Sequence, residues 1–533
     1  MQTIRNNKNN KRLKPEKPKQ PAKKNNPVLL AKYLSYVSPM FVLFLTLWIF
    51  AAFIYDDVFY MAEQSSFFAF SETLMRHQLD LSYGWLNIAG RFLLLSFKYP
   101  WFGALIWAGM LTASVKFLLA VTGKQKALAP LYLALPFAWI AYLVYKELHI
   151  YYIDEPSMLF IPPMVAFVLL LSLFLAKLLL RRTTTQPMSN KIRLYALSTV
   201  TVLALGSYTY ALTAGENTRL TARMQRLMQQ QAWNEMIDTA LSAKEPSRPI
   251  AGYYAIALVQ TDQLLDRLFE LNYQFPNLRL TTHSGNPDAG INLIQQDVNF
   301  YAGLVYTAYH NTMERLVTEG PSIEKVKRLF LCALINDEKM LAEKYLHILE
   351  QIPLEGAFIA HYRPMLQNKE LIAADPELSR VTALLPVEDK FELDYQAPLF
   401  LGYNLVRTNG RSPQALETSL AACLYTKELQ ALLPRTESYM GKSLPTAVEQ
   451  AVALYAFKDP QWLQRFNFNP MTTTRINNFL TAAARFKGNY QEGAKALRGS
   501  YENFYPYYYY FGNRPDPDAP KTPVQAEEKG GVN

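Results

Sequence analysis

The segment Ser157–Leu180, SMLFIPPMVAFVLLLSLFLAKLLL, decides the class of fold to which this chain belongs. It is apolar over its whole length, and its one charged residue, Lys177, lies near one end. A helix of about 20 apolar residues spans the hydrocarbon core of a bilayer. The alternative is a core helix of a large soluble protein, but a run as long as Met164–Leu180 with one charge favours a membrane span.

Four more apolar segments of similar length lie along the chain, and all five fall within residues 34–213. They divide the 533-residue chain into a basic tail, a membrane block and a long polar block. No segment reads as sheet, so the expected fold class is all-α. The other predicted spans are Leu34–Tyr55, Trp101–Thr122, Leu128–Tyr145 and Arg193–Thr213.

Lysine and arginine residues set the expected topology, because loops rich in them stay in the cytoplasm. Residues 1–33 hold ten of them and one acidic residue. The second and fourth loops are also basic, whereas the first and third hold most of the acidic residues of the membrane block. The sequence therefore predicts a cytoplasmic N-terminus, five crossings of a bacterial inner membrane, and an extracytoplasmic block from residue 214 onward.

The net charge of +10 is unevenly distributed along the chain. Residues 214–533 hold 32 basic and 35 acidic residues, so the surplus lies in the tail and the membrane block. A nucleic-acid-binding domain needs a basic face, and we therefore expect no nucleic-acid partner. The tail 1–33 is expected to be disordered. It either binds anionic lipid headgroups or only sets the orientation of the chain.

Histidine and cysteine residues offer no pattern for a metal or a cofactor. The six histidines are scattered, and the sequence contains no CxxC motif. We therefore expect no cofactor and no metal. Cys332 and Cys423 each lie among apolar helical residues, which favours buried thiols. One disulfide between them is the alternative in an oxidising compartment.

Residues 81–98 predict an amphipathic helix that lies in the outer membrane interface. Trp85, Ile88, Phe92 and Leu95 recur at helical spacing, and Pro100 ends the helix before the next span. Helices with one apolar and one polar face lie in the headgroup region of a bilayer.

Two acidic pairs in the outer loops are the catalytic candidates of an alternative, enzymatic interpretation. Asp56 and Asp57 follow the first span, and Asp154 and Glu155 precede the fourth. Together they would suit a divalent cation, or a general base that acts on a lipid-linked sugar. The arrangement resembles that of lipid-dependent glycosyltransferases. The simpler interpretation is solvated loop acids, with Asp154 capping the helix that starts at Pro156.

From residue 214 on, the pattern predicts short helices separated by Pro, Gly, Asn and Asp. The clearest hairpin joins Ile323–Ile335 to Glu338–Ile352. Consecutive hairpins of this size are typical of tetratricopeptide-like α-solenoids, and an irregular helical domain is the alternative. The other predicted helices cover residues 220–230, 232–242, 250–271, 292–317, 413–432, 445–457, 460–466, 472–486 and 490–497.

The polar block 214–512 has one less periodic stretch, near 375–410, which contains Pro376, Pro386 and Pro398 and predicts a boundary between two lobes. Residues 513–533 are rich in Pro, Lys and Glu and are expected to be disordered.

An aromatic run lies just before the C-terminal tail. Such a run either stacks on a sugar or seats a partner, or it docks the chain end onto the fold or the membrane interface. The residues of this run are Tyr505, Tyr507, Tyr508, Tyr509, Tyr510 and Phe511.

Several segments of the chain follow a pattern known from other proteins: Leu86–Leu93 (LNIAGRFL), Tyr99–Gly103 (YPWFG), Tyr253–Leu258 (YYAIAL), Leu264–Phe269 (LLDRLF), the helices between Phe300 and Pro353, and Tyr507–Phe511. In these segments the chain resembles a family of uncharacterised bacterial polytopic membrane proteins. The resemblance covers most of residues 40–511, although the membrane block is shorter here than is usual in that family. It implies several membrane helices followed by a tetratricopeptide-like helical region, and it implies no catalytic residue.

These observations lead to two functional hypotheses. The first is a membrane-anchored, non-enzymatic envelope protein whose extracytoplasmic helical repeats bind a protein or peptide partner. The second is an enzyme that acts on a lipid-linked sugar at the outer leaflet through the acidic pairs of its outer loops.

Overall fold

The computed structural model describes residues 38–80, 84–123, 128–146, 156–180, 189–244, 246–271, 289–385 and 413–512. Every regular element in these ranges is helical, and none is a strand. The prediction of an all-helical chain is therefore confirmed for the described residues. The predicted tails 1–33 and 513–533 lie outside these ranges. Of the expected lobe boundary near 375–410, residues 375–385 are described and residues 386–410 lie outside the described part.

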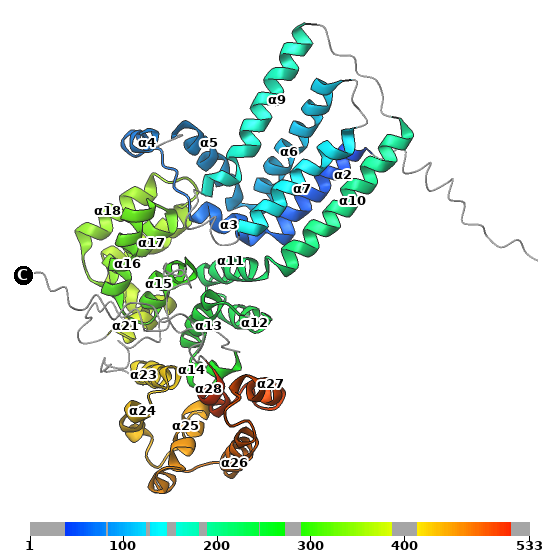
Figure 1. Ribbon diagram of the computed structural model, residues 1–533. Helices are drawn as coiled ribbons and strands as arrows, with labels where there is room; N and C mark the ends of the chain where they lie inside the picture. Colours follow the sequence, from blue (N-terminus) through cyan, green and yellow to red (C-terminus); the bar gives the residue numbers. More distant parts are fainter. Residues whose placement is uncertain are drawn as a thin grey trace, which may run out of the picture.

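Long apolar helices form a bundle at one end of the molecule (Figure 1). Among the described residues, four helices are long and apolar enough to cross a membrane: α6 (Pro100–Thr122), α7 (Ala129–Lys146), α9 (Ile161–Leu179) and α10 (Asn190–Thr213). A fifth span is present if the bent pair Pro39–Ile54 and Asp56–Gln64 counts as one. The five predicted segments thus correspond to four or five candidate spans.

The first predicted segment is bent rather than straight. Helix α2 (Pro39–Ile49) continues into a π-helical turn, η1 (Phe50–Ile54), and α3 (Asp56–Gln64) then leaves at an angle of 68°. A π-helical turn interrupts the regular bonding of a helix and is a common origin of a kink. Because α3 is polar and packs on α11 (Glu216–Gln229), we assign it to the end of the bundle and not to the apolar span.

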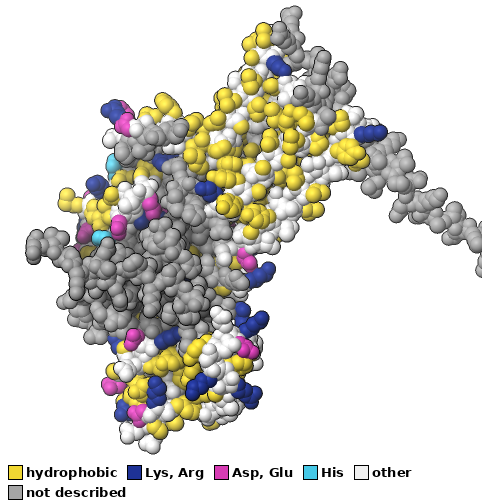
Figure 2. Space-filling model, viewed as in Figure 1, with side chains coloured by type: hydrophobic (Ala, Val, Ile, Leu, Met, Phe, Trp, Pro, Cys, Tyr) yellow, Lys and Arg dark blue, Asp and Glu magenta, His cyan; other side chains and the backbone are white. Residues whose placement is uncertain are grey.

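Several Ser and Thr hydroxyl groups inside the candidate spans bond to their own helix. Ser114, Ser172, Thr201 and Thr209 each donate to the backbone carbonyl four residues earlier, at 2.8–2.9 Å. Such bonds satisfy a polar group where no water is available. The visible surface of the bundle is accordingly dominated by apolar side chains (Figure 2).

Short helices surround the end of the bundle from which the rest of the chain extends. The predicted interfacial helix 81–98 corresponds to α5 (Gly84–Leu94) and η2 (Leu95–Lys98), and residues 81–83 lie outside the described part. Helix α4 (Glu72–Leu79) precedes it, and η4 (Pro156–Leu159) begins the segment that had been expected to be one continuous span from Ser157.

The remaining helices form the outer block, which follows α10 after only two residues. Its first part, up to residue 383, contains α11, α12 (Trp233–Leu241), α13 (Arg248–Gln260), α14 (Leu264–Arg267), η5 (Leu268–Glu270), α15 (Ala289–Tyr301), α16 (Val305–Glu319), α17 (Ile323–Ile335), α18 (Lys339–Glu350), α19 (Gly356–Tyr362), η6 (Arg363–Leu366), α20 (Lys369–Ala374) and α21 (Pro376–Ala383).

The second part of the outer block packs on the first through α14 and carries the C-terminal aromatic run. It contains α23 (Pro413–Thr426), α24 (Leu429–Arg435), η8 (Thr436–Tyr439), α25 (Thr446–Ala456), η9 (Pro460–Gln464), α26 (Pro470–Ala484), α27 (Tyr490–Tyr501) and α28 (Tyr505–Phe511).

Three helices that the pattern predicts as continuous are broken in the structure. The segment 250–271 divides after Gln260, 292–317 divides after Tyr301, and 413–432 divides after Thr426. Each break contains a residue in the left-handed region: Asp262 (φ 56°), Gly303 (φ 79°) or Lys427 (φ 64°). These predictions were wrong because apolar side chains continue through the breaks, so the apolar periodicity does not reveal them.

The same helix-to-helix turn occurs five times among the described residues of the outer block. A left-handed residue ends one helix, and the next amide bonds to the carbonyl five residues earlier, which is the bond of a Schellman motif. These bonds are 2.9–3.0 Å long. The left-handed residues are Gln231, Asp262, Gly303, Asp337 and Lys427.

Candidate functional site at the junction of the bundle and the outer block

Helix α3 joins the bundle to the outer block through an ion pair at its first turn. The Arg226 guanidinium on α11 lies 3.1 Å from an Asp56 carboxylate oxygen and 2.8 Å from one of Asp57. It also lies over the ring of Tyr60, whose hydroxyl donates to Gln229 at 2.9 Å. The two acids therefore fix α3 against the helix that follows the last span.

The structure describes one of the two acidic pairs on which the enzymatic interpretation depends. Asp56 and Asp57 share Arg226, while Asp154 and Glu155 lie outside the described residues. Burial, and then the nearby charge of Asp57, raise the pKa of Asp56. The described residues hold no group of three or more His, Cys, Asp or Glu side chains that could bind a metal ion.

A second set of charges, which we call the junction cluster, lies at the other end of α3. It consists of Glu63, Gln64, Lys98, Lys327 and Glu355. The Glu355 carboxylate forms ion pairs with Lys98 of η2, at 2.5 Å, and with Lys327 of α17, at 2.6 Å. Burial by itself would raise the pKa of Glu355, but the two ammonium groups outweigh it and lower that pKa. The carboxylate thus binds one cation from each side of the junction.

Glu63 is the buried acid of the junction cluster. Its side chain is fully buried, and one oxygen accepts from the Gln64 amide at 2.6 Å. The other oxygen has no hydrogen-bond partner among the described residues. Burial raises the pKa of Glu63 to about 7, against the opposing charge of Lys98. A protonated acid at this position would avoid the cost of a buried unpaired charge.

Two backbone hydrogen bonds complete the junction. The Ile323 amide at the start of α17 donates to the Ser66 carbonyl at 3.0 Å. The Phe70 amide donates to the Gln351 carbonyl at 2.9 Å. The loop after α3 is therefore bonded to both ends of the α17–α18 hairpin.

The interior of the outer block contains a further buried ion pair. Arg328 on α17 binds Asp297 on α15 at 2.6 Å, and Tyr253 donates to the other Asp297 oxygen at 3.2 Å. The guanidinium carbon lies 4.1 Å from the centre of the Phe300 ring, which adds a cation–π contact. The three helices α13, α15 and α17 are thus linked through charged and polar groups in the core.

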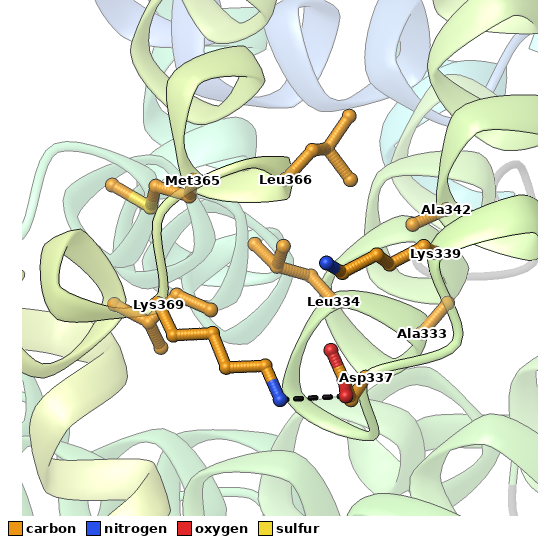
Figure 3. Close-up of a pocket in the computed structure, with 9 residues that line it drawn as sticks. Ala333, Leu334, Asp337, Lys339, Ala342, Met365, Leu366 and Lys369 are labelled. Atoms are coloured by element: carbon orange, nitrogen blue, oxygen red, sulfur yellow. Dashed lines mark hydrogen bonds and ion pairs between the residues drawn. The ribbon is translucent and has the colours of Figure 1, made fainter.

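Helices α20 and α21 lie across the repeated turns of the outer block. Glu377 accepts from Gln231 at 2.8 Å, and Arg380 binds Asp262 with two bonds of 2.6 and 2.9 Å. A Cβ on Gly303 would lie 2.5 Å from the Leu384 carbonyl oxygen. On α20, Lys369 binds Asp337 at 2.6 Å, as Figure 3 shows. Four successive turns are therefore in contact with the segment 369–384.

A small hollow lies between the α17–α18 turn and α20 (Figure 3). Its lining includes Ala333, Leu334, Ala342 and Met365, with Lys339 and Lys369 at the edge. Its empty volume is about 220 Å³, with its solvent-open part included. Because this volume includes space open to solvent, the enclosed part of the hollow is far smaller than the about 300–1,000 Å³ of small-molecule pockets, and the hollow does not suit a substrate site.

A family model matches both regions of the chain. The model for DUF6057, a family of unknown function, matches residues 32–154 and 149–512. The chain belongs to this family. No curated protein and no solved structure matches it. The matched ranges include the bundle, the junction cluster and the outer block, and they end where α28 ends.

In this member of the DUF6057 family, the C-terminal aromatic run is part of the core. It forms helix α28, in which Tyr505, Tyr507 and Tyr508 are buried. The Tyr508 hydroxyl donates to the Tyr425 carbonyl at 2.7 Å, and the Tyr505 amide donates to Gln450 at 2.9 Å. The run thus docks the chain end onto the second part of the outer block. Tyr509, Tyr510 and Phe511 are partly exposed.

Both cysteines of this DUF6057 member are buried thiols. Burial raises the pKa of Cys423 to about 11, which keeps this thiol protonated and unreactive at neutral pH. This agrees with the prediction from their apolar surroundings.

Sequence reasoning missed the junction cluster entirely. Lys98 and Glu355 are 257 positions apart, and Arg226 is 170 positions from Asp56. No local pattern connects residues at such separations. One signal was available: Glu63 is the one charged residue of the segment Val58–Phe70, which is rich in apolar residues, and a lone acid there needs an explanation.

Proposed function

We propose that the protein is a membrane-anchored scaffold of the bacterial envelope and has no enzymatic activity of its own. Its N-terminus lies in the cytoplasm, its bundle crosses the inner membrane five times, and its outer block lies outside. That block is a tetratricopeptide-like α-solenoid which binds a protein or peptide partner. The positive residues of the tail and even loops support this orientation.

The observation that carries the proposal is the repeated helix-to-helix turn. Two consecutive examples, at Gly303 and Asp337, are 34 positions apart. That spacing equals the period of about 34 residues in tetratricopeptide repeats. Helices α15 to α18 also pack mainly on their neighbours in sequence, which is how solenoid repeats are stabilised.

The surface of the outer block offers places for a partner. The turns at Gln231, Asp262 and Gly303 are covered by α21, so we expect the partner on the helical faces. Three large apolar side chains on α16 and α18 are more than half exposed: Tyr306, Val317 and Met340. Exposed apolar residues on a folded surface mark interaction sites when they are grouped.

A photo-crosslinking experiment in intact cells tests this function. A benzophenone amino acid is placed at Tyr306 or Met340, with Tyr490 in the second part of the outer block as an exposed control position. We expect one discrete adduct, identified by mass spectrometry, from Tyr306 or Met340 and none from Tyr490. The absence of an adduct at both test positions, in protein present at its normal level, would overturn the scaffold proposal.

The orientation is tested separately. Protease added to cells stripped of their outer barrier should digest the outer block while the bundle stays protected. Digestion only after lysis would place the outer block in the cytoplasm and redirect the search for its partner.

A further inference from the structure

Exposed apolar side chains meet where the outer block approaches the end of the bundle. On α5, Trp85 and Phe92 lie seven residues apart, hence on one helix face, and are 76 % and 54 % exposed. Phe70, in the loop before α4, is 69 % exposed, and Leu354, between α18 and α19, is 49 % exposed. We call these four residues the apolar corner.

Ring contacts and a backbone bond make this corner continuous. The Phe68 ring lies 5.4 Å from the Phe92 ring and 5.4 Å from the Phe70 ring. The Phe70 amide bonds to the Gln351 carbonyl, three residues before Leu354. The surface thus runs from α5 through Phe70 to the turn that contains Leu354.

Leu354 has an unusual backbone conformation. Its φ is 69°, in the left-handed region that a bulky side chain rarely adopts. The next residue, Glu355, is the N-cap of α19. A strained, large apolar residue with its side chain exposed is a costly combination in water. Strain of this kind persists where the surrounding structure imposes it, and it is concentrated at functional positions.

The position of the corner relative to the spans is set by the junction cluster. Glu355, adjacent to Leu354, binds Lys98 at 2.5 Å. Lys98 comes two residues before α6, one of the candidate spans. Around that start, Tyr99, Trp101 and Phe102 are also exposed. Tyrosine and tryptophan are enriched at the headgroup level of membrane proteins. Figure 1 shows α4 and α5 beside this end of the bundle and close to α17 and α18.

We propose that the apolar corner inserts into the headgroup region of the adjacent leaflet, so that the outer block rests on the lipid surface through Leu354, beside Phe70 of the loop before α4. The partner is the bilayer itself, because the corner continues the exposed aromatic residues at the start of α6. An interfacial α5 is expected from its sequence; the added element is that Leu354, a residue of the outer block, shares the same surface. This inference is independent of any protein partner.

Environment-sensitive fluorescence in lipid nanodiscs tests the insertion. The variant Leu354→Cys of the full chain is labelled with a thiol-reactive nitrobenzoxadiazole dye. The dye labels the new cysteine selectively, because both native cysteines are buried. Met340→Cys is the matched control, because Met340 lies in the same hairpin, is 87 % exposed and is not part of the corner. Each protein is measured in phosphatidylcholine discs with and without lipids brominated near the headgroup.

We expect the dye at position 354 to have blue-shifted emission and to lose intensity in brominated lipid, whereas the dye at position 340 does neither. Phe70→Cys serves as a second test position and should behave like position 354. Water-like emission at both 354 and 70 would overturn the proposal. A blue shift without loss in brominated lipid would also overturn it, because protein and not lipid would then cover the corner.

Discussion

The bundle and the outer block differ in the polar and charged side chains that they bury. The four straight candidate spans contain no acidic residue, and several of their Ser and Thr hydroxyl groups donate to their own backbone. The outer block buries Asp297, Arg328 and Glu377 in its core instead. A helix facing lipid cannot compensate an isolated charge, whereas a core formed in water can bury a charge with its partner. The residues with the most shifted pKa values accordingly lie in the outer block and at the junction.

The largest expected effect comes from removing one member of the buried ion pair in the outer block. Arg328→Met leaves the Asp297 carboxylate buried without its cation. Breaking a buried pair in this way costs about 3–5 kcal/mol. We expect that loss in the free energy of unfolding of the outer block, measured by pulse proteolysis in urea on the full chain in bicelles.

Lys369→Met is the control for this variant. It breaks the exposed pair with Asp337, and exposed pairs contribute about 0–1 kcal/mol. Equal losses of unfolding free energy for the two substitutions would mean that burial does not make the Arg328–Asp297 pair more important for stability than the exposed pair.

The junction should respond to pH in a direction set by Glu63. The folded protein holds the Glu63 proton up to pH about 7, whereas the unfolded chain loses it near the ordinary value of 4.5. The contribution of Glu63 to stability is therefore complete below pH 4.5 and is lost as the pH rises to 7. At 1.36 kcal/mol per pH unit the total is about 3 kcal/mol. Unfolding free energies measured from pH 5 to pH 8 should fall accordingly.

A second buried acid makes this test specific. Burial also raises the pKa of Glu324, in α17, to about 7. Glu63→Gln should remove only part of the pH dependence, and the double variant Glu63→Gln, Glu324→Gln should remove most of it. If the single variant keeps the full wild-type slope, Glu63 is not the titrating group of the junction.

The contact between α21 and the repeated turns gives a prediction of intermediate size. Gly303→Ala places a Cβ 2.5 Å from the Leu384 carbonyl oxygen and strains a residue with φ 79°. We expect a loss of more than the 1–2 kcal/mol or so that left-handed strain alone costs. Gly441→Ala is the matched control, since Gly441 has φ 75° and nothing near its Cβ position. Equal decreases in melting temperature for the two variants would show that α21 moves away from this turn without further cost in stability.

The smallest effect is expected from the partly exposed ion pairs of the junction. Asp56→Asn and Asp57→Asn each weaken one contact of Arg226, and such pairs contribute at most about 1 kcal/mol. We therefore expect near-normal stability and no change in envelope integrity, assayed as sensitivity to detergent. A severe envelope defect at a normal protein level would favour the enzymatic hypothesis over the scaffold.

The sequence predicted what depends on local composition. Apolar length identified the spans, and the pair Ile323–Ile335 and Glu338–Ile352 was located within two residues at each end. The breaks at Asp262 and Gly303 were missed, although Gly303 was a visible candidate for a left-handed turn.

Long-range chemistry was not predictable in the same way. Asp56 and Asp57 drew attention because they are adjacent, yet their partner Arg226 lies beyond four further apolar helices. The tyrosines of α28 suggested either a ligand platform or, as the favoured interpretation, a docked chain end. Only the contacts with Tyr425 and Gln450 placed them in the core.

The pairing of Asp56 with Arg226 has a consequence for how the protein is made. The ribosome synthesises the acidic pair 169–170 residues before its arginine, and Lys98 appears 257 residues before Glu355. Until Arg226 and Glu355 have been synthesised, Asp56, Asp57 and Lys98 have no counterpart. A chain that ends before Arg226 would contain every described candidate span and still be unable to form the junction. Such a chain would present quality-control proteases with an unpaired polar segment, Asp56–Gln64, at the end of the bundle.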